Sequence, residues 1–279
     1  MKGIIDWNEL WKLMRMSSPL RRTLDEDAGS HGDKYAKQCN ESMMRSKSKE
    51  RTEMEISKME LNPEYAVLDI GSGPGRLVIP IAKQVKTVTV IEPSRVMMAY
   101  LRENMEKEDV KNITCINKRW EDVELSVDID PHDVVIASYS LGMRDMQEAL
   151  AKIDATAKRY VYLFTAVGRW MYEELWKEIY GEKQPTWWLD YIYLCNILHD
   201  LEIYSNVEIS DYEFELQYDS LNDAVNKWKE MYDMPSEKER VLRGYLAKML
   251  VEDKNGGKLC LKRKSKSAMV WWGKNHETE

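Results

Sequence analysis

The sequence predicts an α/β fold, in which a mostly parallel β-sheet carries helices on both faces. Between residues 65 and 170, short apolar runs rich in valine and isoleucine alternate with longer segments of helical periodicity. The short runs are apolar along their whole length, which is typical of strands that are buried on both faces. Strands that alternate with helices pair in parallel through crossover connections, so these two observations indicate one sheet between two helix layers.

The expected elements of this region follow in order. Strands are expected at 66–70, 87–92, 112–116, 132–139 and 159–166. Helices are expected between them at 75–84, 94–108 and 146–157. The first of these helices contains Pro80, which is awkward in a helix interior, and the second has Ser94 available as its N-cap.

The first sixty residues are helical in character. Trp7, Leu10, Trp11 and Met14 fall on one helical face, and Pro19 is expected to break that helix. A polar stretch at 25–34 then precedes a second helical region at about 35–59. We therefore expect residues 1–60 to form a helical N-terminal cap.

The alternation of strands and helices fades after residue 170. Segments 169–181 and 187–201 are expected to be helical, and 207–218 alternates with period two, as an antiparallel strand does. A charged helical pair at 220–252 is broken by Pro235, and the chain closes with a strand within 256–274.

The composition excludes several classes of protein. The net charge of −7 argues against nucleic-acid binding through a broad positively charged surface. The four cysteines lie far apart with no CxxC pair, so neither a zinc cluster nor a disulfide framework is indicated, and no metal is expected. The most apolar run, 187–198, is about half the length that a bilayer requires and contains Asp190. With no signal peptide visible at the N-terminus, we expect a cytoplasmic protein without membrane association.

An acid, a glycine-rich loop and a second acid follow one another around the first two strands. Asp69 stands near the end of the first strand, and the loop after it consists of Gly71, Ser72, Gly73, Pro74 and Gly75. Glycines permit a sharp turn and the close approach of a ligand, and the next helix N-terminus offers free N–H groups. Glu92 ends the second strand, where its carboxylate can accept both hydrogen bonds of a ribose diol.

A nicotinamide dinucleotide fits this pattern poorly. Its binding folds use GxGxxG, whereas the spacing here is GxGxG and Arg76 takes the place of the third glycine. Asp69 would repel a pyrophosphate but attract an ammonium group. A ligand with a ribose, an adenine and a cationic amino-acid tail satisfies both acids, and S-adenosylmethionine is that ligand.

The stretches VLDIGSGPGRL and VTVIEPS resemble the cofactor motifs of the class I S-adenosylmethionine-dependent methyltransferases, and the likeness extends over roughly residues 65–165. The resemblance implies a Rossmann-like, mostly parallel seven-stranded sheet whose last strand is antiparallel. It implies that residues 61–279 form the methyltransferase domain, with helical insertions around 170–205 and 220–255. Together with the N-terminal cap, these insertions are expected to form a lid over the carboxyl ends of the strands.

The resemblance also implies roles for single residues. Asp69 and the loop from Gly71 to Gly75 would hold the methionine end of the cofactor, and Glu92 would bind the ribose hydroxyls. The adenine side would be lined by Pro93, Ser94 and Met97.

The stretch after the third strand departs from the family pattern. The family usually places there an acid that contacts the adenine amino group, but this chain has Arg119 and Trp120, followed by Glu121. Trp120 can lie against the adenine face, or it can close the pocket from the core. Glu121 is the expected polar contact of the adenine.

The sequence says less about the part of the site that would bind the methyl acceptor. Ser138 and Tyr139 end the fourth strand, where the family places residues between cofactor and acceptor, and Ser138 is expected to contact the cofactor. The Asp/Asn-Pro-Pro-Tyr motif of many amino-methylating enzymes does not occur there. Tyr139, Tyr35 and His31 are weak candidates for a catalytic role, and no catalytic residue is identified. Methyl transfer depends mainly on alignment, and a base is needed only if the acceptor keeps its proton at neutral pH.

The sequence therefore predicts an enzyme that transfers a methyl group from S-adenosylmethionine to an acceptor and releases S-adenosylhomocysteine. A small-molecule acceptor is favoured, because the chain is acidic, carries a lid and shows no nucleic-acid-binding module. The alternatives are a methyltransferase that acts on RNA or protein, and a non-catalytic partner protein that only binds the cofactor.

Overall fold

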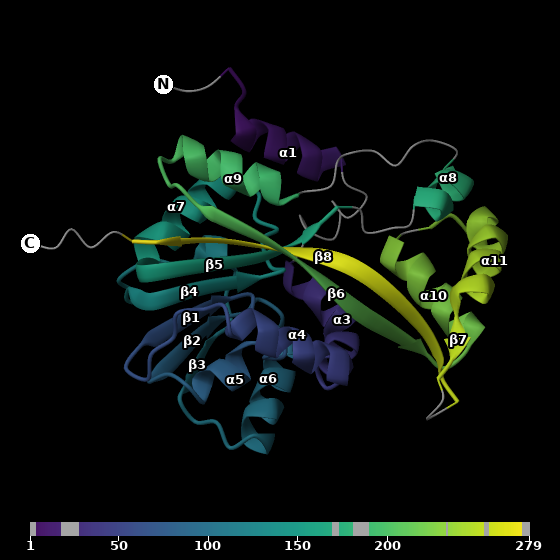
Figure 1. The fold of residues 1–279 in the computed structure, drawn as a ribbon, viewed down its shortest axis with the longest axis horizontal. Coiled ribbons are helices and arrows are strands. Elements are labelled where there is room, and N and C mark those ends of the chain that lie inside the picture. The colour runs from purple at the N-terminus through teal and green to yellow at the C-terminus, as the bar shows by residue number, and fades with distance from the viewer. Residues whose placement is uncertain are drawn as a thin grey trace, which may run out of the picture.

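A computed structural model describes residues 4–17, 28–168, 173–180, 190–232, 234–253 and 257–274 of the chain. Its centre is one eight-stranded sheet with the strand order β3-β2-β1-β4-β5-β8-β6, and β7 pairs with β8 beside this path (Figure 1). The strands are β1 Ala66–Ile70, β2 Thr87–Ile91, β3 Ile113–Ile116, β4 His132–Ser138, β5 Ala157–Val167, β6 Asn206–Tyr218, β7 Val251–Glu252 and β8 Leu259–Gly273. The helices are α1 Trp7–Ser17, α3 Ala28–Met43, α4 Ser46–Ile56, α5 Val78–Ala82, α6 Arg95–Lys107, α7 Met146–Thr156, α8 Glu173–Tyr180, α9 Tyr191–Asp200, α10 Leu221–Tyr232 and α11 Glu239–Met249.

Strand pairing confirms the predicted fold class. β1 to β5 pair in parallel, whereas β8 lies antiparallel to both β5 and β6. The sheet is therefore mostly parallel and its last strand is antiparallel, as expected. The sheet has eight strands where seven were expected, because the two-residue strand β7 also pairs with β8.

Helices cover both faces of the sheet. On one face, Trp11 of α1, Leu150 of α7 and Leu198 of α9 share a buried cluster with the strands. On the other face, the cluster contains Ile56 of α4, Ile81 of α5 and Leu101 of α6. Helix α9 falls within the segment 170–205 that was expected in a lid, but it packs on the sheet as part of the core.

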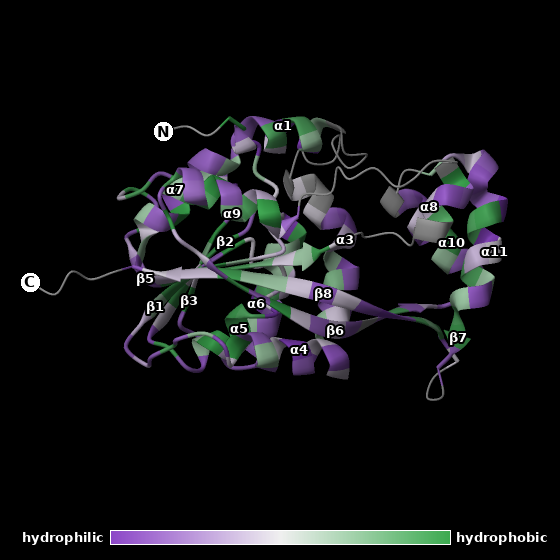
Figure 2. Cartoon of the chain, turned by 45° about the horizontal axis from the view of Figure 1, so that its top comes forward, coloured by the Kyte–Doolittle hydropathy of each residue, from purple (hydrophilic) through white to green (hydrophobic). Residues whose placement is uncertain are grey.

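A third buried cluster lies apart from the sheet. β6 and β8 continue beyond their neighbours as a long two-stranded ribbon, and α8, α10 and α11 gather at its end (Figure 1). Trp176 of α8, Trp228 of α10 and Leu242 of α11 are buried there, together with Tyr218 and Leu261 from the ribbon. We call this unit the distal lobe. Apolar residues of its helices pack in this cluster, while the far part of the ribbon that carries it is largely hydrophilic (Figure 2).

The N-terminal helices differ in one respect from the expectation. Helix α3 already begins at Ala28 and includes residues that were expected to lie in a polar stretch. A Cβ atom added to Gly32 would lie 2.8 Å from the Cβ of Ser94, so glycine, a poor helix former, lets α3 approach α6 closely here. Tertiary packing therefore outweighs helix propensity. Pro19 lies outside the described residues.

Among the described residues, no helix combines the length and the apolar character needed to cross a membrane.

Candidate functional site

The glycine-rich loop joins β1 to α5 at the carboxyl edge of the sheet. Gly71, Gly73 and Gly75 all have positive φ angles, of 76°, 55° and 100°, which side chains rarely tolerate. A Cβ at Gly71 would overlap the side chain of Ser140, whereas a Cβ at Gly73 would meet only the Met97 sulfur, 4.0 Å away. Gly71 is therefore required by the packing of the protein, and the space beside Gly73 is open.

Glu92 joins this loop to the strand beside it. Its Oε2 accepts a hydrogen bond from the Gly73 N–H at 2.8 Å, and its Oε1 accepts one from the Ser94 N–H at 2.8 Å. The side chain is 6% exposed, and burial raises the pKa of its carboxyl, while the two backbone hydrogen bonds oppose that shift. The structure thus brings the predicted ribose acid and the predicted loop together.

Two buried polar atoms, one in the loop and one in the strand before it, have no hydrogen-bond partner among the described residues. Asp69 is 2% exposed, and its Oδ1 makes no hydrogen bond to the described residues; the same holds for the hydroxyl of Ser72. Burial raises the pKa of Asp69 to about 7, and the charge of Arg76 opposes that rise. Unsatisfied buried polar atoms are costly, so these two groups fit a ligand that supplies hydrogen-bond donors, such as an ammonium group.

Helix α3 packs against the start of α6, beside the glycine-rich loop. The Ser94 hydroxyl accepts a hydrogen bond from the Met97 N–H and so caps α6, as expected. It donates to Asp33 of α3 at 2.5 Å, and Asp33 also accepts from the Val96 N–H. Pro93, Ser94 and Met97 consequently lie where the loop, α6 and α3 meet.

Asn117, directly after β3, donates to the carbonyls of Glu92 and Pro93 at 2.7 and 3.0 Å, and the residues expected at the adenine follow it. Trp120 is 3% exposed and belongs to the core cluster of α7, and its Nε1 donates to the Ala149 carbonyl at 3.3 Å. The Trp120 ring is therefore packed in the core, and its contact with the adenine stays a prediction. Glu121 is exposed, and Arg119 forms a two-pronged ion pair with Asp122.

The tip of β4 carries Ser138 and Tyr139. Ser138 accepts a hydrogen bond from Arg76 at 2.9 Å. Tyr139 has a φ of 57°, a strained conformation for a bulky residue that is often found at functional sites. Its phenol shares a 2.5 Å hydrogen bond with Ser267 of β8, and desolvation of the phenol raises its pKa above the ordinary value, although 41% of the residue is exposed.

The two other weak catalytic candidates lie on α3. Tyr35 is half-buried, and burial together with Glu230 of α10 raises its pKa. The backbone of His31 is helical, but its side chain lies outside the described residues. His132 is buried against Thr89 at 2.9 Å, in the sheet interior rather than at the site.

A buried charge network beneath the site was not anticipated from the sequence. Glu55 of α4 pairs with Arg51 at 2.8 Å and with Arg76 at 2.6 Å. The Arg51 guanidinium lies over the rings of Tyr139 and Tyr212, 4.4 and 4.0 Å from their centroids. Arg51 and Glu55 stand four apart on one helix, which suggests an ion pair, but nothing in the sequence shows that it meets Arg76.

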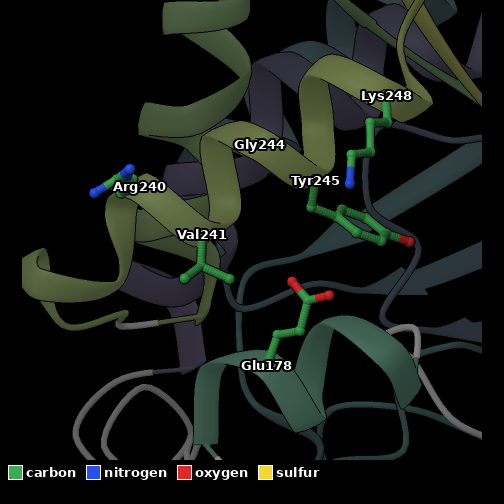
Figure 3. A pocket seen from close by; sticks show the side chains of 6 residues that line it. All are labelled: Glu178, Arg240, Val241, Gly244, Tyr245 and Lys248. Atoms are coloured by element: carbon green, nitrogen blue, oxygen red, sulfur yellow. The ribbon is translucent and has the colours of Figure 1, made fainter.

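Two other clusters lie away from the loop. A cavity of about 430 Å³ in the distal lobe is lined by Glu178 of α8 and by residues of α11 (Figure 3). Glu215, Asp253 and Cys260 gather on the ribbon near β7. Burial raises the pKa of the Cys260 thiol to about 11, and this thiol donates to Glu215, so the group already has an internal hydrogen bond.

Comparison with known proteins agrees with this geometry. Residues 67–159 match the model of a methyltransferase domain family. A protein of Haemophilus influenzae, named only "Uncharacterized protein", is 30% identical over 221 residues, which are 78% of this chain and 79% of that protein. A protein of Methanocaldococcus jannaschii named "Probable cobalt-precorrin-6B C(15)-methyltransferase (decarboxylating)" is 35% identical over 68 residues, which are 24% of this chain and 37% of that protein.

The fold also matches solved structures. The YcgJ protein of Bacillus subtilis superimposes with a TM-score of 0.54 at 13% identity, over 81% of this chain and 99% of that one. This likeness concerns the fold, and the family model adds the activity. By its strand order, its glycine-rich loop and these matches, the chain belongs to the class I S-adenosylmethionine-dependent methyltransferases.

Proposed function

We propose that this methyltransferase acts on a small-molecule acceptor, and that Asp69, Glu92 and the loop between Gly71 and Gly75 hold its cofactor. The observation that carries the assignment is the pair of buried carboxylates on the neighbouring strands β1 and β2, one on either side of an open glycine backbone. Glu92 is already fixed in place by two backbone N–H groups. Asp69 is left with an unpaired oxygen for the cationic end of the ligand.

The chemistry of the site is mainly one of alignment. When bound, S-adenosylmethionine supplies an electrophilic methyl group on a sulfonium, and its transfer leaves S-adenosylhomocysteine. Positioning of the two reactants alone can contribute about 7–11 kcal/mol. In this chain, Glu92 and the loop orient the adenosyl part, and Tyr139 is a wall of the acceptor side. The acceptor reacts through its own lone pair.

The N-terminal cap, residues 1–60, belongs to the cofactor site in this proposal. Asp33 of α3 binds both the Ser94 hydroxyl and the Val96 N–H, so α3 is anchored on the helix end beside Glu92. The distal lobe, which combines α8 from the expected insertion at 170–205 with α10 and α11 from that at 220–255, bounds the acceptor space in this proposal. The electrostatic influence of Glu230 on Tyr35 supports this arrangement.

The charge distribution supports a small-molecule acceptor. The basic run on β8 would suit RNA, but it lies opposite acidic residues of β6, with Lys262 facing Glu215, Lys264 facing Glu213 and Lys266 facing Asp211. The Lys266–Asp211 pair closes to 2.7 Å. This ladder neutralises the basic run, and the net charge of −7 offers no other broad attraction for a polyanion.

The proposal is tested by methyl transfer in fractionated cell extract. The full chain is incubated with S-adenosylmethionine carrying a labelled methyl group, together with the low-molecular-weight, RNA or protein fraction of the extract. We expect label in the low-molecular-weight fraction and none with a Gly73→Val variant, in which the space beside the loop is filled. Label in RNA or in protein would instead support the alternative acceptors. Binding of cofactor without transfer to any fraction would support the non-catalytic partner.

A further inference from the structure

Arg76 follows the glycine-rich loop directly, and its guanidinium reaches across to the tip of β4. Nη1 contacts the Thr52 hydroxyl at 3.1 Å and pairs with Glu55 at 2.6 Å, and Nη2 donates to the Ser138 hydroxyl at 2.9 Å. A guanidinium offers five N–H donors. Nε makes no hydrogen bond or ion pair with the residues that the structure describes, so Arg76 retains donor capacity at the site.

Asp69 and Arg76 lie on the same face of the sheet. Asp69 pairs in register with Ile136 of β4, and alternate residues of a strand point to the same face, so Ser138 and Asp69 share that face. By binding Ser138, the guanidinium therefore spans the tips of β1 and β4 close to the Asp69 carboxylate. The charge of Arg76 acts on Asp69 accordingly. No direct bond joins the two groups among the described residues.

The unpaired carboxylate oxygen of Asp69 lies close to the Arg76 cation, which has donors to spare. Such a pair of groups can bind a ligand that carries both a positive and a negative charge. The amino-acid tail of S-adenosylmethionine carries an ammonium and a carboxylate on one carbon atom, so it needs an anion and a cation side by side. Asp69 alone would leave the carboxylate of the tail next to a like charge. A planar guanidinium binds carboxylates well, because two parallel N–H groups can meet both oxygens.

We propose that Arg76 binds the carboxylate of the cofactor's amino-acid tail, while Asp69 binds its ammonium group. This assignment rests on the proposed cofactor site. Arg76 then distinguishes the intact cofactor from adenosyl compounds that lack the carboxylate. Glu55 is a positioning residue in this scheme, since its ion pair fixes the guanidinium against Ser138 and Thr52.

A purely structural role of Arg76 gives a different pattern of binding. If the guanidinium only linked α4 to β4, its loss would disturb the whole pocket and weaken every adenosyl ligand alike. If it binds the carboxylate, its loss weakens only ligands that carry a carboxylate. Three ligands separate the two roles: S-adenosylhomocysteine has both charges, 5′-deoxy-5′-(3-aminopropylthio)adenosine has the amine alone, and 5′-methylthioadenosine has neither.

Calorimetry tests the proposal by measuring how tightly the full chain binds each of these three ligands. The wild type is compared with Arg76→Gln, with Asp69→Asn and with the control Arg159→Gln. Arg159 sits at the start of β5, at the opposite edge of the sheet, and pairs with Asp133. For Arg76→Gln, we expect affinity for S-adenosylhomocysteine to fall about tenfold to hundredfold, with the other two ligands unchanged. For Asp69→Asn, we expect both amine-bearing ligands to weaken and 5′-methylthioadenosine to bind as before.

Equal losses for all three ligands in Arg76→Gln, or no loss for any, would overturn the proposal. Unchanged binding of 5′-methylthioadenosine shows that the variant has folded. If Arg76→Gln does not fold, Arg76→Lys keeps the charge within the network and is expected to lose affinity for S-adenosylhomocysteine alone; an equal effect on all three overturns the proposal. A wild-type chain that binds none of the ligands would instead refute the proposed cofactor site.

Discussion

The Oε2 atom of Glu92 accepts a 2.8 Å hydrogen bond from the backbone N–H of Gly73. The bond joins the tip of β2 to the middle of the loop after β1, so the acid and the glycine backbone that face the ligand are fixed relative to one another. A carboxylate oxygen can accept more than one hydrogen bond. The carboxylate therefore retains acceptor capacity for a diol while it holds the loop.

Replacement of Glu92 tests this relationship directly. We expect Glu92→Ala to weaken binding of S-adenosylhomocysteine by roughly 1–3 kcal/mol, because charge-assisted hydrogen bonds to the ribose are lost. Isothermal calorimetry measures the change. Glu103→Ala is the matched control, since Glu103 lies on the exposed face of α6 in a 3.8 Å pair with Lys107. An affinity equal to that of the wild type would remove Glu92 from the site.

Gly73 is expected to matter for binding more than for folding. Gly73→Val should abolish ligand binding while the fold persists, because the side chain would occupy the open space beside the loop. The left-handed φ of 55° adds a cost of about 1–2 kcal/mol for a residue with a Cβ. Gly257→Ala is the control, because Gly257 has a similar φ of 65° and an added Cβ there would meet no atom within 4 Å. This variant should lose stability through the backbone strain but bind the ligand as before. Retained affinity in Gly73→Val would contradict the placement of the ligand.

The buried carboxyl of Asp69 makes the stability of the protein depend on pH. Its pKa rises from the ordinary value of 3.8 to about 7 on folding, so the folded chain binds more protons than the unfolded chain between these values. The free energy of unfolding should therefore fall as pH rises from about 4 to 7, by up to about 1.4 kcal/mol per pH unit. Urea unfolding of the wild type and of Asp69→Asn at pH 5 and pH 8 isolates this contribution. An identical pH dependence in both proteins would refute it.

Ligand binding should release a proton from the same group. An ammonium favours the ionised carboxylate, so binding of S-adenosylhomocysteine lowers the pKa of Asp69. Affinity is then expected to decline as pH falls below about 7. Calorimetry at pH 6 in two buffers of different ionisation enthalpy measures how many protons are released when the ligand binds. We expect the release of close to one proton from the wild type, and of none from this position in Asp69→Asn. A proton count unaffected by the substitution would exclude Asp69 as the partner of the ammonium.

Glu55 supports two arginines and should be important for stability. Glu55→Gln removes the only negative charge seen between Arg51 and Arg76 among the described contacts. We expect a loss of about 3–5 kcal/mol in the free energy of unfolding, the usual cost of breaking a buried ion pair from one side. Glu53→Gln, an exposed neighbour on α4, should change stability by less than about 0.5 kcal/mol. Similar stabilities of the two variants would show that the network contributes little.

The cofactor half of the fold could be predicted from the sequence because its signals are local. The run from Val67 to Ile70, the glycines after it and Glu92 at the end of β2 all lie within one unit of strand, loop, helix and strand. Because β1 and β2 pair in parallel, with Asp69 in register with Val90, both acids lie at the carboxyl ends of neighbouring strands.

Long-range contacts decide what could not be predicted. The early start of α3 depends on the contact between Gly32 and Ser94, and helix propensity argues against it. The partners of Arg76 come from α4 and β4, which are separated in sequence from the loop. The basic run on β8 is balanced only once β6 pairs with it, since the opposing acids lie about fifty residues earlier.

A crystal structure of the full chain with S-adenosylhomocysteine bound tests the central claim most directly. We predict the ribose hydroxyls within hydrogen-bond distance of the Glu92 carboxylate, and the amino group of the tail beside Asp69. A ligand bound elsewhere on the protein, or a glycine-rich loop left empty at saturating ligand, would contradict it.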